Sequence, residues 1–168
     1  RFPGPTVLPP RQWRLAGGGR WAGPALATFV QPGQDAAEAL VSEALGLVGE
    51  DTGADRVEDA GRGEDAGADG DASAAWWDAL VAAACAALRR RRPQIEAVGS
   101  AWDRGPHSVR TGAELLSART GTALDVVVLL AGALERLGVP AVLLLTPKTA
   151  FLGYWRNEED AERIPASP

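Results

Sequence analysis

SARTGTALDVVVLLAGALERLG, residues 117–138, is the stretch of this sequence that decides the fold. Thr122 precedes an apolar run and Asp125 follows three residues later, which is the spacing of a capping box at a helix N-terminus. Gly138, with a proline two residues beyond it, gives the usual signals for a helix C-terminus. Three consecutive valines favour a strand, but the length and both ends predict a helix over 123–137. Because this helix is apolar nearly all round, we expect it to be buried at the centre of the fold.

The segments on either side predict helices followed by a pair of strands. Residues 34–48 and 73–92 carry apolar stripes with helical spacing. Beyond the central helix, 140–146 is expected to be a strand buried on both faces, and 149–155 a second strand antiparallel to it. This order of helices and then antiparallel strands is typical of the α+β class. The shorter predicted elements are strands at 11–15 and 25–30, a strand and then a loop within 94–109, and a helix at 110–118 with a capping box of Thr111 and Glu114.

Charge is unevenly distributed along the 168 residues. The chain carries a net charge of −5, yet residues 50–73 hold nine acidic residues and two arginines, a net −7, which leaves about +2 for the rest. This acidic segment has no aromatic residue and many Gly and Ala, so we expect a disordered insertion between two helices. The length and the 46% hydrophobic content indicate one domain. We expect that domain to cover 11–160, between tails at 1–10 and 161–168.

Two motifs carry a resemblance to a known family. The sequence RTGTALDVVVLLAGALERLGVPAVLLL, residues 119–145, followed by KTAFLGYW, residues 148–155, resembles the transglutaminase-like branch of the papain-like cysteine-peptidase superfamily. It is most similar to the transglutaminase-like region near the N-terminus of large bacterial helicase-related proteins, whose motifs read Gly-Thr-Cys-Leu-Asp and Gly-His-Ala-Phe-x-Gly-x-Trp. The resemblance covers most of 11–160 and is most specific over 109–155. The matching residues are Gly121, Thr122, Leu124 and Asp125 in the first motif, and Ala150, Phe151, Gly153 and Trp155 in the second.

Two departures from the family's motifs bear on function. Ala123 stands where the family has its catalytic Cys, and Thr149 where it has its His, while Lys148 replaces the Gly before that His. Without a thiol and an imidazole, the family's acyl-transfer or peptidase chemistry has neither nucleophile nor base. The resemblance therefore implies a papain-like core and a pseudoenzyme, with a vestigial cleft between Ala123 and Thr149. The other residues expected at this cleft are Thr122, Asp125, Lys148, Phe151 and Trp155.

Few other residues offer chemistry. Cys85 lies among alanines in a predicted helix, and we expect it to be a buried, inert thiol. His107 is the only histidine and falls in a predicted loop. One Cys and one His permit no metal cluster, and no phosphate-binding motif occurs, so no metal or cofactor is expected. The single Cys and the lack of a signal peptide favour a cytoplasmic location, and no apolar run is long enough for a membrane span, so no membrane partner is expected.

The sequence leaves three functions open. The first is a catalytically inactive scaffold or binding module inside a larger bacterial, helicase-related protein, with a protein, a peptide or other domains of the same chain as partner. The second is an enzyme of altered mechanism, with Thr122 or Thr149 as a weak nucleophile. The third is a nucleic-acid-binding accessory domain that uses the four arginines at 89–92. These arginines also suit the negative end of a helix dipole, and we expect that simpler role for them.

Overall fold

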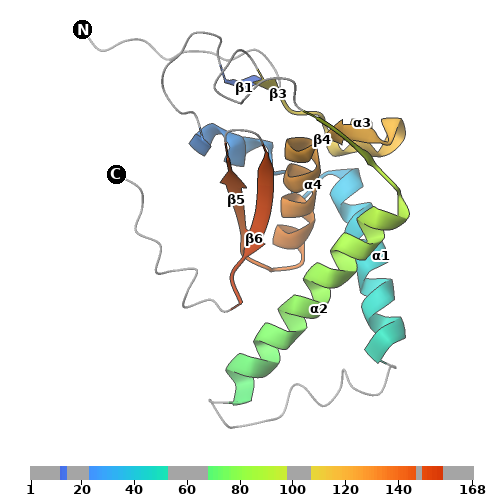
Figure 1. Ribbon diagram of the computed structural model, residues 1–168. Coiled ribbons are helices and arrows are strands. Elements are labelled where there is room, and N and C mark those ends of the chain that lie inside the picture. The colour runs from blue at the N-terminus through green and yellow to red at the C-terminus, as the bar shows by residue number, and fades with distance from the viewer. Residues whose placement is uncertain (1–11, 15–22, 53–67, 98–106, 147–148, 157–168) are drawn as a thin grey trace, which may run out of the picture.

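The computed structural model describes residues 12–14, 23–52, 68–97, 107–146 and 149–156. The chain contains both helices and short strands, which is compatible with the predicted α+β class (Figure 1). The elements are β1 (Gln12–Arg14), the 3-10 helix η1 (Gly23–Phe29), α1 (Asp35–Thr52), α2 (Ala68–Arg90), β2 (Gln94–Glu96), β3 (His107–Ser108), α3 (Gly112–Ala118), β4 (Thr120–Thr122), α4 (Ala123–Arg136), β5 (Ala141–Leu145) and β6 (Ala150–Tyr154).

Helix α4 is the central element, as the sequence predicts. It stands between the β5–β6 pair on one side and α1 and α2 on the other (Figure 1). The helix includes the valine run, which is therefore not a strand. Ten of its residues are buried, including every position from Val127 to Leu134. The helix ends at Arg136, and Gly138 takes the left-handed conformation with φ 75° that a glycine adopts easily. Burial of a helix on all sides explains why its sequence has no polar stripe.

Helices α1 and α2 form an antiparallel pair that packs against α4. Their contact faces are rich in alanine, and Ala44, Ala84 and Ala87 are each fully buried, which lets the two backbones approach closely. Leucines fill the space beside them, with Leu40 and Leu80 almost fully buried. The apolar stripe over 34–48 is confirmed with one exception: Leu45 is 47% exposed. It lies at the edge of the stripe, where no described element covers it.

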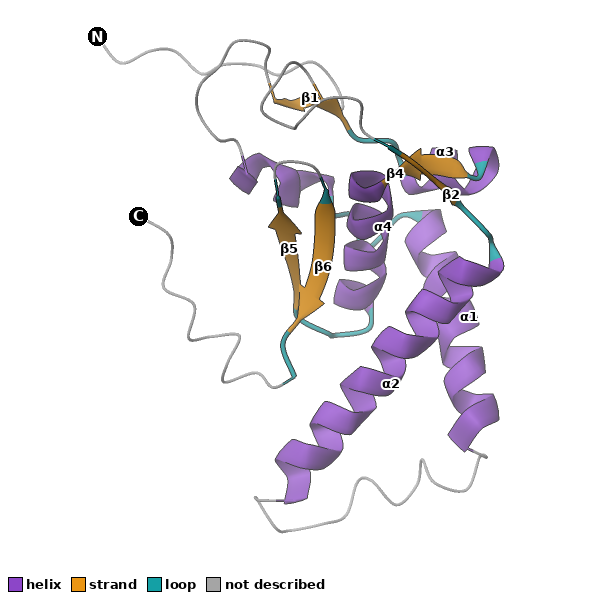
Figure 2. Cartoon of the chain, viewed as in Figure 1, coloured by secondary structure: helices purple, strands orange, loops and turns teal. Residues whose placement is uncertain are grey.

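The strands form three separate pairs (Figure 2). β5 and β6 are antiparallel in continuous register from Ala141↔Tyr154 to Leu145↔Ala150. Their inner face packs on α4 through Ala150 and Leu152, whereas Leu144 and Phe151 pair on the outer face and are each 52% exposed. The prediction that 140–146 is buried on both faces is therefore wrong. Only one face of the pair is covered by the described elements, which is common for antiparallel strands.

Several element boundaries differ from the sequence predictions. The predicted strand at 25–30 is the 3-10 helix η1, because Pro24 suits a first helical turn and Leu26 is buried against α4 residues. The acidic segment is shorter than expected, since 50–52 belong to α1 and 68–73 to α2. The remainder of it and the predicted tails lie outside the described residues. Strands β3 and β4 were not predicted; they pair with β1 and β2, respectively.

Candidate functional site

The entrance to α4 is built as a capping box. Thr122 is the N-cap residue, with extended φ −78° and ψ 165°, and its Oγ1 accepts a hydrogen bond from the Asp125 backbone N–H at 3.3 Å. The Asp125 carboxylate in turn accepts bonds from the Thr122 backbone N–H at 2.8 Å and from the Thr122 hydroxyl at 3.0 Å. Its second oxygen accepts a bond from the Arg110 backbone N–H at 2.8 Å. Asp125 is only 2% exposed, so these donors replace the water that a buried carboxylate loses.

Gly121 fits this entrance because there is no room for a side chain. A Cβ built at this position would lie 2.5 Å from Leu115 Cδ1 and 3.1 Å from Asp125 Oδ2. The residue lies in β4, which pairs in parallel with β2 and leads directly into α4. The Gly-Thr-x-Leu-Asp pattern therefore has a complete structural explanation in this chain. It combines close packing of α3 on β4 with a buried cap.

The two positions that replace the family's catalytic pair are not joined by any hydrogen bond. Ala123 is the first residue of α4 and is partly exposed. Thr149 precedes β6, and its backbone is held in a turn, with its carbonyl accepting from the Thr146 N–H at 2.9 Å and its N–H donating to Thr146 Oγ1 at 3.2 Å. The cleft between Ala123 and Thr149 stays a prediction.

The remaining predicted site residues are distributed around the hairpin. Lys148 lies outside the described residues, so its expected orientation away from Thr149 is untested. Phe151 is on the outer face of the hairpin. Trp155 is partly exposed after β6, where its backbone N–H donates to the Pro140 carbonyl at 3.0 Å and closes the open end of the hairpin. Among the described residues, none of these side chains shares a hydrogen bond or ion pair with Asp125.

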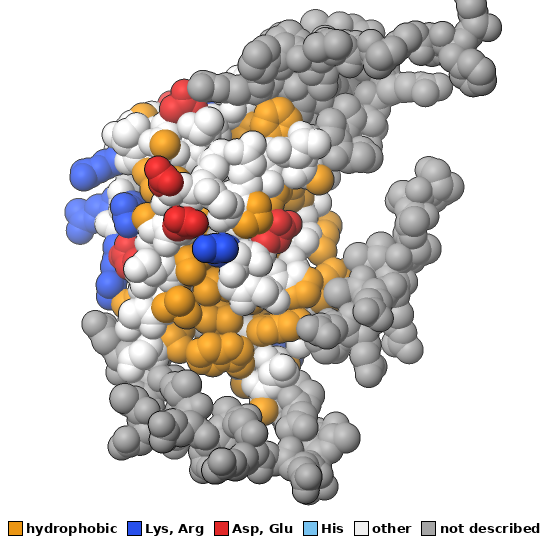
Figure 3. Space-filling model, turned by 180° about the vertical axis from the view of Figure 1, so that it is seen from behind, with side chains coloured by type: hydrophobic (Ala, Val, Ile, Leu, Met, Phe, Trp, Pro, Cys, Tyr) orange, Lys and Arg blue, Asp and Glu red, His pale blue; other side chains and the backbone are white. Residues whose placement is uncertain are grey.

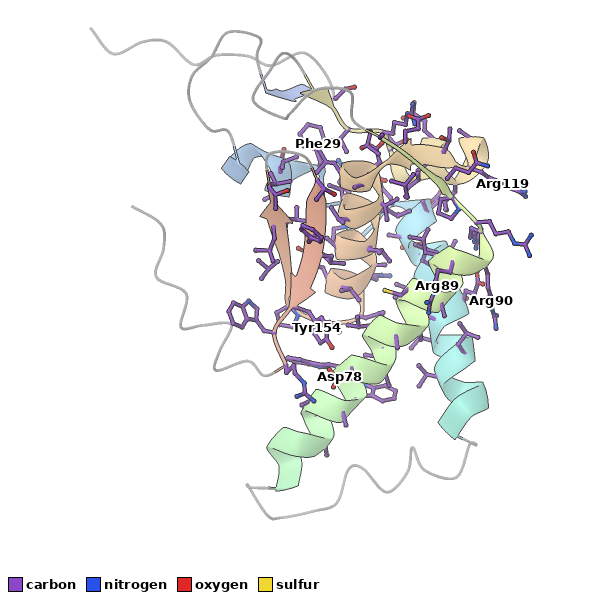
Figure 4. The ribbon with its side chains drawn as sticks, in the orientation of Figure 1. Phe29, Asp78, Arg89, Arg90, Arg119 and Tyr154 are labelled. Atoms are coloured by element: carbon purple, nitrogen blue, oxygen red, sulfur yellow. The ribbon has the colours of Figure 1, made fainter. Side chains whose placement is uncertain are left out.

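A pocket of about 180 Å³ opens elsewhere, and no pattern in the sequence indicates it. It lies where the turn between η1 and α1 meets the segment before α3 and the middle of α4. Phe29 is one of the residues that line the pocket, and Figure 4 shows it above the N-terminal end of α4. None of the residues predicted for the vestigial cleft lines it. The lining residues are Phe29, Gln31, Gln34, Val109, Arg110, Thr111, Gly112, Val128 and Leu129.

Cys85 and His107 are on separate elements. Cys85 is half-buried on α2 beside the main core, rather than fully buried as expected. Burial raises the pKa of its thiol, and the nearby charge of Arg89 opposes that rise only in part. A thiol with a raised pKa is a weak nucleophile at neutral pH, which agrees with an inert role. His107 begins β3, where its backbone pairs with Arg14.

A basic cluster forms at the C-terminal end of α2, and we define it as Arg89, Arg90, Arg91, Arg92 and Arg119. Figure 4 shows its labelled members, from α2 and from the end of α3, at the same edge of the molecule, and Figure 3 shows blue side chains gathered along one edge. The Gln94 N–H donates to the Arg119 carbonyl at 2.8 Å and so brings the two parts together. Glu43 lies 3.1 Å from Arg91 and 3.9 Å from Arg90. Within the described part of the chain, no ion pair engages Arg89, Arg92 or Arg119.

A second polar contact links the end of β6 to α2. The Tyr154 hydroxyl donates to Asp78 Oδ1 at 2.6 Å, and Arg156 donates to both oxygens of the same carboxylate, at 3.2 Å and 2.7 Å (Figure 4). The hydrogen bond from Tyr154, followed by that from Arg156, holds the pKa of Asp78 below its usual value. The same bond raises the pKa of Tyr154. This contact joins the end of the hairpin to α2.

Comparison with known proteins adds no relative. No protein-family model matches the chain, and no characterised protein or solved structure shows significant similarity to it. Among the described residues, no cluster of three or more His, Cys, Asp or Glu side chains is arranged to hold a metal ion. No helix in the described segments has the length and apolarity that crossing a membrane requires. The resemblance to transglutaminase-like domains therefore depends on the two sequence motifs alone.

Proposed function

We propose that this chain is a catalytically inactive transglutaminase-like domain that serves as a scaffold or a protein- or peptide-binding module. Its setting would be a larger, helicase-related bacterial protein in the cytoplasm. The observation that carries the proposal is the capping box of α4. Every polar group that this box places at the helix entrance is engaged in holding the fold, and the residue at the reactive position, Ala123, offers a methyl group.

The engagement of Thr122 argues against its use as a nucleophile. Its hydroxyl donates to Asp125 Oδ2 and accepts from the Asp125 N–H, so an attack by this oxygen would dismantle the helix cap. Asp125 Oδ2 already accepts the Thr122 hydroxyl proton in a hydrogen bond, but the same carboxylate also holds the backbone of the cap. Its two oxygens already accept bonds from three donors, two of them backbone N–H groups. Proton transfer to this carboxylate would weaken the bonds that hold the start of α4.

Thr149 is no better placed. A threonine hydroxyl needs an adjacent base within about 3 Å to become nucleophilic. Among the described residues, no hydrogen bond engages the Thr149 hydroxyl. The hydrogen bonds of this residue join its backbone N–H and carbonyl to the backbone N–H and hydroxyl of Thr146. The altered enzyme therefore has less support than the inactive module.

The catalytic half of the proposal is tested by turnover of a panel of amide and ester substrates. We expect the unmodified chain, Thr149→Ala and Thr122→Ser to show the same rate as buffer. Activity in the unmodified chain that disappears in Thr149→Ala would replace the proposal with a threonine-based enzyme. Thr122→Ser is the matched control, because it keeps the hydroxyl and the cap while changing the side chain next to Ala123.

The binding half is tested by selection of a random peptide library against the immobilised chain. We expect a consensus to be enriched, and the enriched peptides to bind the chain in solution. A selection that yields no consensus, repeated with a protein ligand library and the same result, would contradict a binding role and leave only a scaffold. The two halves are independent, so each can fail without the other.

A further inference from the structure

We infer that the free edge of β2, together with the basic cluster, binds an extended acidic peptide segment of a partner protein, which adds to β2 as a strand. This inference rests on the proposed binding function and specifies its partner and its surface. The apolar outer face of the β5–β6 pair and the pocket beside Phe29 are weaker candidates, because nothing in their surroundings indicates what would occupy them.

The first argument is the backbone of β2. This strand pairs with β4 in parallel, and no other described strand pairs with it. Residues of a parallel strand alternate in the direction of their hydrogen bonds, and Gln94 donates to the Arg119 carbonyl on the β4 side. The N–H and C=O of Ile95 therefore point away from β4, where no described residue bonds to them. Such an edge is a template for another strand.

The second argument is exposure. All three residues of β2 are exposed, and Ile95 is 56% exposed, the largest value among the large apolar residues that the structure describes. Parallel strands normally have both faces covered, so a two-stranded parallel pair in which all three residues of one strand are exposed is unusual. An added strand would cover Ile95 with one of its own alternate side chains and complete the ladder. The same segment would bring its other side chains past the arginines at the start of β2.

The third argument is the charge next to this edge. Arg92 lies two residues before β2, Arg119 lies one residue before β4, and both are exposed. At the other end of β2, Glu96 accepts from the Thr120 hydroxyl at 2.8 Å and lies 3.2 Å from Arg110, so its charge is already countered. Arg92 stands just before the start of β2, whereas Arg119 lies on its β4 side, where its carbonyl accepts from the backbone N–H of the first β2 residue. The surface around β2 therefore presents positive charge to a ligand, and this local charge favours carboxylates on the partner.

The conformation of two of these arginines points the same way. Arg92 has φ 50° and Arg119 has φ 54°, in the left-handed region where Gly or Asn is usual at the end of a helix. A residue with a Cβ is disfavoured there by roughly 1 kcal/mol or more. Both arginines occupy such a position beside the same strand. A role of the two guanidinium groups in binding explains why arginine, and not glycine or asparagine, stands at both positions.

An acidic peptide fits this surface better than nucleic acid does. The described segments that carry it, 83–97 and 112–122, contain no aromatic residue on which bases could stack. The acidic segment that follows α1 joins α2 at Ala68, which lies about 32 Å along the helix from Arg89, whereas a segment of a partner can approach β2 directly. We therefore assign the surface to a segment of another protein.

The test uses the full chain and a fluorescently labelled peptide of alternating glutamate and valine residues, followed by anisotropy. We expect binding that weakens with salt and that is about tenfold weaker or more in the double variant Arg92→Gln, Arg119→Gln. Arg136→Gln is the matched control. It removes one exposed arginine from the far end of α4, where Arg136 pairs with Glu38 at 3.5 Å, and binding should not change.

Two further arms test strand addition itself. A peptide with every second backbone amide methylated should lose binding to the unmodified chain, because methylation removes the N–H groups that pair with an edge. Ile95→Pro should also lose binding and keep the thermal melting of the parent chain, since the Ile95 N–H is not used by β4. If the proline variant does not fold, the methylated peptide still gives the answer.

Three results would overturn the inference. One is peptide binding that is unchanged in the arginine double variant or with the methylated peptide, which would place the peptide elsewhere and leave the proposed function intact. Another is failure of the acidic peptide when the library selection yields a different consensus. The third is preferential binding of a single-stranded oligonucleotide that the arginine double variant abolishes, which would assign the surface to nucleic acid.

Discussion

The two capping boxes of this chain have nearly the same geometry and very different surroundings. In the box of α3, Thr111 Oγ1 accepts a hydrogen bond from the Glu114 backbone N–H at 3.3 Å, and the Glu114 carboxylate accepts one from the Thr111 backbone N–H at 2.9 Å. In the box of α4, the corresponding distances between Thr122 and Asp125 are 3.3 Å and 2.8 Å. Glu114 is partly exposed, whereas Asp125 is 2% exposed and also accepts a bond from Arg110. Equal hydrogen bonds should thus contribute unequally to stability, because water can replace one carboxylate and cannot reach the other.

The largest effect expected from this difference is that of Asp125→Ala. The substitution leaves the Thr122 N–H, the Thr122 hydroxyl and the Arg110 N–H without their acceptor in a buried place. We expect the free energy of unfolding to fall by about 3 kcal/mol or more. Urea denaturation followed by circular dichroism measures it. A loss no greater than that of Glu114→Ala would show that burial does not distinguish the two boxes.

Gly121→Ala should have the next largest effect, because it crowds the buried box without removing a hydrogen bond. The new Cβ would lie 2.5 Å from Leu115 Cδ1, and we expect a loss of about 1–3 kcal/mol in the free energy of unfolding. Gly46→Ala is the control, since a Cβ at that position in α1 meets no atom within 4 Å. That variant should be more stable by up to about 1 kcal/mol. Equal and small effects of the two variants would refute the close packing around Gly121.

Glu114→Ala should cost about 1 kcal/mol or less, because water can satisfy the groups that it leaves at the start of α3. The same denaturation experiment gives this value. A loss close to that of Asp125→Ala would mean that the α3 box is protected from water in solution.

The parts of the fold that sequence could predict are those with a local signal. Both capping boxes, the helix at 123–136 and the hairpin of β5 and β6 follow from residues within a few positions of one another. The pairing of β2 with β4 joins residues 94–96 to 120–122, and no local pattern encodes that choice. The strand expected at 25–30 was wrong because burial of Leu26 against α4 outweighed the local preference.

The same limit applies to the candidate sites. The sequence identified Thr122 and Asp125 correctly as a cap, because their spacing alone defines the motif. It treated the arginines at 89–92 as the end of a helix and could not join them to Arg119, which only the β2–β4 pairing brings near. The pocket beside Phe29 was missed for the same reason, since three distant segments form it. Sites made by tertiary pairing need the structure, whereas caps do not.

The contact between Tyr154 and Asp78 extends the comparison to a partly exposed hydrogen bond. At 2.6 Å it is shorter than any bond of the capping boxes, yet both residues are only partly buried, so water competes more than it does at Asp125. We therefore expect Asp78→Ala to change the free energy of unfolding less than any of the substitutions above that destabilise the chain. The contact should instead be visible in the titration of the phenol. Tyr154 is the only tyrosine of the chain, so its ultraviolet absorbance reports this one group.

The direction of that titration follows from the charge of Asp78. The carboxylate accepts the phenolic proton and disfavours the phenolate, so the pKa of Tyr154 is raised above its ordinary value of 10.0. The stabilisation from this bond is fully present below that ordinary value and is lost as the pH rises through the raised pKa. In Asp78→Ala the pKa should fall back, and the charge of Arg156 should lower it further. If the phenol of Tyr154 titrates at the same pH in both chains, the hydrogen bond to Asp78 is not maintained in solution. The short distance between the two oxygens would then have no effect on the pKa of Tyr154.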